Sequence, residues 1–137
     1  TPKPSSAASD VYKRQMLNKG AEMNITDIHT EATQAAKKAV VDFLEKWNIN
    51  TGGNEYGEPM YCGFAWVEVP VTRTNSKQAK ELQSIGFKAS WRPKIMQLWD
   101  PAKHHGQSMD CKEVGAEAYA DVLNKYGFKA YMSSRAD

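Results

Sequence analysis

Long apolar runs and an excess of charge of either sign are both missing from this chain of 137 residues. A membrane-spanning helix needs roughly 20 consecutive apolar residues, and neither such a stretch nor the apolar segment of a secretory signal is present. The 18 basic and 16 acidic residues are interspersed and leave a net charge of +2, which argues against binding to nucleic acid. The composition predicts a cytoplasmic protein that does not bind membranes.

Cysteine is scarce too, with only Cys62 and Cys111. Two cysteines cannot build the disulfide framework of a small secreted domain, so we expect free thiols in a reducing compartment. Familiar catalytic patterns are also missing: the chain has no G-x-S-x-G, no phosphate-binding P-loop, no G-x-G-x-x-G and no H-E-x-x-H. These absences favour a binding protein over an enzyme, and they predict no cofactor.

The residues that are present are those of one ordinary domain, with 41% hydrophobic and 25% charged residues. Residues 1–22 lack hydrophobic periodicity and predict a disordered or non-native leader. Residues 19–23, KGAEM, can be encoded by a string that places AAGGAG just before ATG, as a bacterial ribosome-binding site does. We therefore expect translation to start at Met23, a bacterial or phage source, and a single domain over residues 23–137.

Hydrophobic periodicity predicts an α+β fold with the order α-β-α-β-β-α-β, in which one small four-stranded sheet is packed by three helices mainly on one face. The expected elements are helix 24–47, strand 60–71, helix 76–85, strands 87–91 and 95–99, helix 108–126 and strand 128–133. In the last helix we expect the buried side to hold Val114, Ala118, Val122, Leu123 and Tyr126. The open edges of so small a sheet predict a homo-oligomer, a dimer or higher.

Strict alternation in strand 60–71 separates two kinds of side chain. Cys62, Phe64, Trp66 and Glu68 share one face of the strand, and the other face carries Gly63, Ala65, Val67 and Val69. Because Gly63 and Ala65 are small, the second face allows a helix or a ligand to approach closely.

Two segments of the chain resemble each other: residues 79–89 and 120–130 share six positions, including Gly-Phe-Lys-Ala. One interpretation is two helices that end in the same way, with glycine in the left-handed conformation and a phenylalanine that packs back. The other interpretation is a duplicated helix–strand unit.

The region from residue 91 to 110 holds the densest group of polar and aromatic side chains and ends where a helix begins. A helix N-terminus favours an anion, tryptophans stack on bases, and basic side chains neutralise phosphate. The candidate ligand-binding residues here are Trp91, Arg92, Lys94, Trp99, His104, His105, Gln107 and Ser108, joined by Trp66 from the central strand and Arg135 near the C-terminus. The alternative is a pair of core tryptophans, a solvated basic face and a serine that only caps the helix.

Adjacent histidines do not readily bind one ion together, and no Cys, His, Asp or Glu stands at the usual spacing from them, so the sequence predicts no metal site. Either His104 or His105 is a conceivable general base. His29 is expected to be an ordinary residue on a helix surface.

Three segments together resemble a family of small, uncharacterised proteins encoded by tailed bacteriophages. They are C-G-F-A-W-V at residues 62–67, W-D-P followed by G-Q-S at residues 99–108, and K-E-x-G-A running to S-R-x-D at residues 112–137. The resemblance covers residues 62–137 and carries no catalytic residues. It implies action in the cytoplasm of an infected bacterial host, and by analogy with phage biology it raises the capture of nucleotide second messengers used in bacterial immunity.

We therefore expect a phage-encoded binding protein that sequesters a small anionic, nucleotide-like ligand. The first alternative is a small enzyme that acts on nucleotides, which turnover of the ligand would reveal. The second is a protein–protein adaptor or inhibitor, which an exposed apolar patch without small-molecule binding would indicate.

Overall fold

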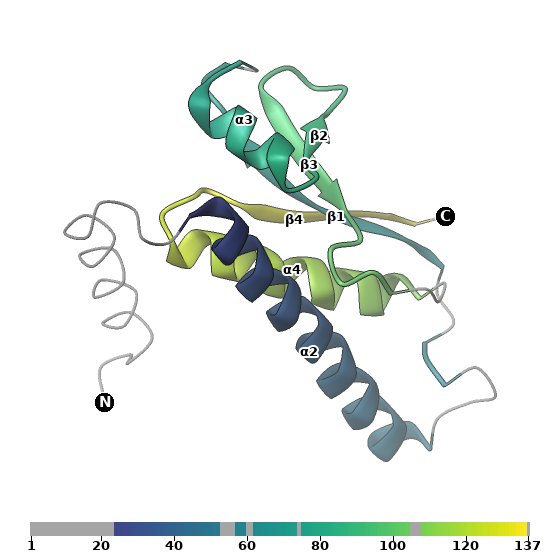
Figure 1. Ribbon diagram of the computed structural model, residues 1–137. Coiled ribbons are helices and arrows are strands. Elements are labelled where there is room, and N and C mark those ends of the chain that lie inside the picture. The colour runs from purple at the N-terminus through teal and green to yellow at the C-terminus, as the bar shows by residue number, and fades with distance from the viewer. Residues whose placement is uncertain (1–23, 53–56, 60–61, 74, 105–107, 137) are drawn as a thin grey trace, which may run out of the picture.

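The computed structural model describes residues 24–52, 57–59, 62–73, 75–104 and 108–136 (Figure 1). The helices are α2 (Ile25–Thr51), α3 (Lys77–Ser84) and α4 (Met109–Lys125), and the strands are β1 (Gly63–Pro70), β2 (Lys88–Ala89), β3 (Ile95–Trp99) and β4 (Tyr131–Ala136). Their order confirms the predicted α+β fold. The expected start at Met23, the leader before it, and the candidate residues His105 and Gln107 lie outside the described residues. Within the described ranges, no helix has the length and apolar character needed to cross a membrane.

All strands of the sheet are antiparallel, in the order β2-β3-β1-β4. The central strand β1 pairs with β3 on one side and with β4 on the other, so that Trp66 lies opposite both Trp99 and Ser133. Directly opposed residues of antiparallel strands point to the same side of the sheet. The pairing therefore brings side chains of three strands onto one surface.

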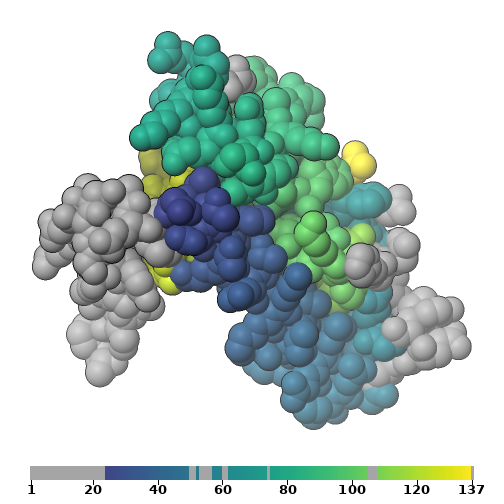
Figure 2. All heavy atoms as spheres, in the orientation of Figure 1, coloured from purple at the N-terminus to yellow at the C-terminus, as the bar shows by residue number. Residues whose placement is uncertain are grey.

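The hydrophobic core lies between one face of this sheet and the three helices. Ala65, Val67 and Val69 of β1 are buried there with Leu82 of α3 and Leu123 of α4. Figure 1 shows α2 and α4 crossing on the same side of the sheet, and in the space-filling view α2 lies in front of α4 (Figure 2). The alternation predicted for β1 is confirmed, because its residues are buried and half-buried in turn.

Glycine makes two of the close approaches possible. A side chain at Gly63 would place its Cβ 2.5 Å from Sδ of Met109, and one at Gly115 would place its Cβ 2.7 Å from Cβ of Ala102. Gly63 therefore lets α4 begin directly against β1. Gly115 lets α4 approach both Ala102, in the segment after β3, and Val40 of α2.

The buried side of α4 differs from the predicted one. Its buried residues include Gly115, Ala116 and Tyr119, whereas Val114 and Ala118 are only half-buried. The periodicity argument favoured the larger apolar residue Val114, but the close contact with α2 is made where the small residues lie. The prediction is wrong for the first half of the helix, whereas Leu123 and Tyr126 in its second half are buried as predicted.

Three elements also have other bounds than predicted. Strand 87–91 is reduced to the two residues of β2, Lys88–Ala89. Helix α2 continues through Thr51 and ends at Gly52, whose left-handed conformation (φ 76°) lets its N–H donate to the carbonyl of Asn48. Strand β4 begins at Tyr131 rather than at Phe128. Phe128 and Ala130 instead complete the end of α4: Phe128 N–H donates to the Leu123 carbonyl, and Ala130 N–H donates to Oδ1 of Asn124.

Candidate functional site

The face of the sheet turned away from the helices carries a group of aromatic and charged side chains. We call it the open face, and it comprises Phe64, Trp66, Glu68, Gln97, Trp99, Tyr131, Ser133 and Arg135. Each of these side chains is at least partly exposed. Helix α4 reaches this face at Phe64, where Nζ of Lys112 lies 5.0 Å from the ring centroid. Period-two alternation in β1, β3 and β4 explains why the side chains of the open face gather there.

The centre of the open face is a stacked pair of tryptophans. The ring centroids of Trp66 and Trp99 lie 4.6 Å apart with an interplanar angle of 18°, and the Phe64 ring lies 5.8 Å from Trp99. These separations are typical of favourable aromatic pairs. Trp99 is 42% exposed although it is one of the largest apolar residues in the chain. The alternative in which Trp99 is a core residue is wrong, because its ring is accessible from solvent.

Charged groups surround the aromatic pair. Glu68 accepts a hydrogen bond from Nε1 of Trp66 at 2.8 Å and forms an ion pair with Arg92, so its carboxylate orients the indole and is neutralised by the guanidinium. On the other side, the Arg135 guanidinium lies 5.8 Å from the centroid of Phe64, within the range of a cation–π contact. The open face therefore combines flat apolar surface with cationic groups at its rim.

A shallow depression extends the open face at the end of β2. It is lined by Gly86, Lys88, Ala89, Gln97, Leu98 and Trp99. Because β2 has only two residues, the edge of β3 beside Trp99 is left uncovered by it. The depression thus places a lysine next to an exposed indole ring.

The predicted site residues fall into three groups. Trp66, Arg92, Trp99 and Arg135 meet at the open face, although Trp66 and Trp99 are far apart in the sequence. Trp91 is 89% exposed in the turn between β2 and β3, and Lys94 is exposed in the same turn, where its carbonyl accepts from Val71 N–H. Neither is part of the stacked group. Ser108 and His104 lie in a separate cluster at the start of α4.

Ser108 is buried and is the N-cap of α4, with Oγ accepting from Cys111 N–H. The place where we expected an anionic ligand is taken by the chain itself. The Glu58 carboxylate accepts the Ser108 N–H at 3.2 Å, and Asp110 adds a second carboxylate in the first turn. Negative charge at this helix end is favourable, and here it comes from side chains.

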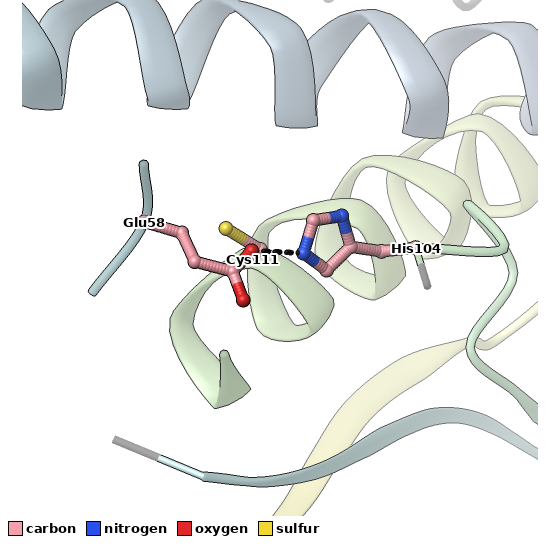
Figure 3. Close-up of side chains that lie close together, drawn as sticks. All are labelled: Glu58, His104 and Cys111. Carbon is pink, nitrogen blue, oxygen red and sulfur yellow. Dashed lines mark hydrogen bonds and ion pairs between the residues drawn. The ribbon is translucent and has the colours of Figure 1, made fainter. Parts of the chain in front are cut away.

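Glu58 also bonds to His104, with 2.6 Å between Oε2 and Nε2. The Cys111 sulfur completes the group: the carboxylate, imidazole and thiol atoms lie within 4.8 Å of one another (Figure 3). Burial is the largest cause that raises the pKa of the Cys111 thiol above its ordinary value, and the nearby carboxylates Glu58 and Asp110 also raise it. These three residue types are all ligands of transition metals.

Sequence reasoning missed Phe64, Glu68 and Tyr131 as site residues, and it missed Glu58 and Cys111. The alternation of strand 60–71 had already placed Phe64 and Glu68 beside Trp66, so that signal was present. No local spacing connects Glu58 with His104 or Cys111, because they come from separate loops and a helix. Comparisons with family models, with curated proteins and with solved structures give no match to this chain.

Proposed function

We propose that this protein binds a small anionic, nucleotide-like ligand on its open face and acts by holding it. The observation that carries the proposal is the stacked pair Trp66 and Trp99 on a sheet surface that the described helices leave uncovered. An aromatic ring on such a surface offers its face to a planar base, and stacking contributes about 1–3 kcal/mol per base. The resemblance to tailed-phage proteins supports an immune signal of the infected bacterium as the ligand.

The charges on the open face fit a ligand that carries phosphate. Arg135 lies beside Phe64 at one end, and Lys88 lies in the depression beside Trp99 at the other. Arginine binds phosphate through two parallel hydrogen bonds, whereas lysine acts as a point charge. A base stacked near Trp99 therefore has cationic groups on both sides of it.

The same surface supports binding more than turnover. Its carboxylate, Glu68, is held by Arg92 and by the Trp66 indole, so it is not poised to act as a general base. Sequestration requires affinity and no catalytic group. The chain also lacks the nucleophile and phosphate-loop motifs of common nucleotide-processing enzymes.

The test is a binding screen of the full chain against mono-, di- and cyclic nucleotides, followed by thermal unfolding and by tryptophan fluorescence. A ligand at about 100 times its dissociation constant adds about 2.7 kcal/mol to the free energy of unfolding. Trp99→Ala and Arg135→Ala should each weaken binding at least tenfold. Trp91→Ala is the matched control, because it removes an exposed indole from outside the stacked group and should leave affinity unchanged.

Each outcome of the screen decides something. Recovery of the bound ligand intact supports sequestration. Recovery of a chemically altered ligand would show that the protein is an enzyme instead. If Trp91→Ala weakens binding as much as Trp99→Ala, the open face is not the site. If no nucleotide binds while a single-stranded oligonucleotide or a protein does, the small-ligand proposal is wrong.

A further inference from the structure

A second group of side chains lies at the start of α4 and shares no residue with the open face. Glu58 comes from the segment before β1, His104 from the loop after β3, and Cys111 from the first turn of α4. Cys111 is buried, and the side chains of Glu58 and His104 are each 15% exposed. Three segments distant in the sequence thus bring an oxygen, a nitrogen and a sulfur to one sheltered point.

The arrangement differs from a catalytic relay of carboxylate, histidine and thiol. In such a relay one ring nitrogen faces the carboxylate and the other faces the nucleophile. Here Nε2 of His104 bonds to Glu58, and Figure 3 shows Nδ1 turned away from both Glu58 and Cys111. The three groups converge on a point, as the ligands of a metal ion do.

Each of the three residues is also held in place by the backbone around it. Ser108 N–H donates to Oε1 of Glu58 at 3.2 Å, which leaves Oε2 directed at His104. His104 N–H donates to Oδ1 of Asp100 at 3.2 Å, and Cys111 N–H donates to Oγ of Ser108. The first of these bonds orients the Glu58 carboxylate, as supporting hydrogen bonds do for metal ligands, and the other two fix the backbone at His104 and Cys111.

Electrostatics favours a cation at this point. A carboxylate and a thiol lie close together in a sheltered site, and ionising both without a counter-charge is costly. A divalent ion neutralises both anions at once. When it binds, the Cys111 thiol releases its proton to solvent. The proton shared between Nε2 of His104 and Oε2 of Glu58 leaves that hydrogen bond, to solvent or to Nδ1, so that both atoms can coordinate the ion.

We propose that Glu58, His104 and Cys111 bind a zinc ion. The sulfur excludes the hard ions Mg²⁺ and Ca²⁺, whereas zinc accepts sulfur, nitrogen and oxygen ligands in a tetrahedral site at about 2.0–2.3 Å. The three ligand atoms lie within 4.8 Å of one another. Neighbouring ligands of a tetrahedral zinc ion are about 3.3–3.8 Å apart, so rotation of side chains must widen the 2.6 Å contact between Glu58 and His104. Three protein ligands leave the fourth position for water, so the ion is open to a further ligand.

The test uses the full chain without an affinity tag, stripped of metal and then titrated with Zn²⁺ and with Co²⁺. We expect one ion per chain, and a cobalt spectrum with intense visible bands of tetrahedral geometry and a thiolate charge-transfer band. Cys111→Ser should abolish the charge-transfer band and weaken zinc binding more than about 100-fold. Cys62→Ser is the matched control, because it removes the exposed cysteine and should change neither result.

His104→Gln and Glu58→Gln should each weaken zinc binding while circular dichroism and thermal unfolding show a folded chain. Glu58→Gln keeps an oxygen acceptor for Ser108 N–H, so it tests the ligand role without removing the loop contact. The proposal is overturned if the stripped chain takes up no zinc, or if folded Cys111→Ser binds it as tightly as the parent. Loss of the charge-transfer band in Cys62→Ser would also overturn it.

Discussion

A single contact between α2 and α4 shows how burial changes the chemistry of one residue. Nδ1 of His29 lies 2.6 Å from the hydroxyl of Tyr119, which is fully buried. The sequence-based expectation of an ordinary surface histidine is therefore wrong. Periodicity placed His29 beside the buried stripe of its helix but could not show that a tyrosine from another helix would reach it.

The titration of His29 should make stability depend on pH. Burial, followed by repulsion from Lys103, lowers the pKa of His29 below its ordinary value of 6.5. The unfolded state therefore binds more protons than the folded state just below pH 6.5. The free energy of unfolding should decrease as pH falls below about 6.5, and the contribution of His29 should be fully present only above that unfolded pKa.

Urea unfolding at several pH values, with His29→Gln as the control, measures this effect. Glutamine retains a polar partner for Tyr119 but does not titrate. As pH falls, the free energy of unfolding of the parent should decrease more than that of His29→Gln. Parallel pH profiles for the two proteins would show that His29 does not contribute.

At the scale of elements, the two helix ends with the shared Gly-Phe-Lys-Ala sequence show what local sequence determines. Gly86 and Gly127 both have positive φ, and the phenylalanine after each donates its N–H to a leucine carbonyl in the preceding helix. The interpretation of a common helix end is confirmed. The segments then diverge, since Lys88 begins β2 whereas β4 starts at Tyr131, so no duplicated helix–strand unit follows.

The contact between Gly115 of α4 and Ala102 gives a prediction at the same scale. Gly115→Ala would gain helix propensity, but its Cβ would lie 2.7 Å from Cβ of Ala102 and 3.2 Å from Cγ2 of Val40. Ala102 has no side-chain rotamer with which to yield. We expect a net destabilisation of about 1–3 kcal/mol, as for overpacking in other cores.

A double-mutant cycle with Ala102→Gly, measured by urea unfolding, distinguishes this clash from other causes. The double variant should recover most of the stability lost in Gly115→Ala, so the two changes should not be additive. Simple additivity would place the strain elsewhere in the contact between α2 and α4.

The fold could be predicted from the sequence because the patterns that determine its helices and strands are local. Apolar spacing, the caps Asn24, Ser76 and Ser108, and the alternation in β1 each act within a few residues. The residues of the candidate site could be predicted only in part, because their proximity depends on how the strands pair across the sheet. Nothing local indicates that Trp66 and Trp99 are register partners, or that Glu58 reaches the start of α4.

For the whole molecule, the outer edge of the sheet supports our expectation of a homo-oligomer. Strand β4 has six residues and, among the residues that the structure describes, pairs on one side only, with β1. An edge of that length offers unpaired N–H and C=O groups to another strand. We expect sedimentation velocity to give a dimer, and hydrogen exchange to show protection of β4 amides that increases with protein concentration. A monomer at every concentration would contradict this association.

The one-sided core has a consequence for how the sequence can change. Along β1, Ala65 and Val67 are fixed by packing against the helices, whereas Phe64 and Trp66 between them contribute to the open face. Under the proposed function, neighbouring positions of one strand are held by separate constraints, one from folding and one from ligand binding. A change at Phe64 or Trp66 would then alter the binding surface while the residues that pack the core stay the same.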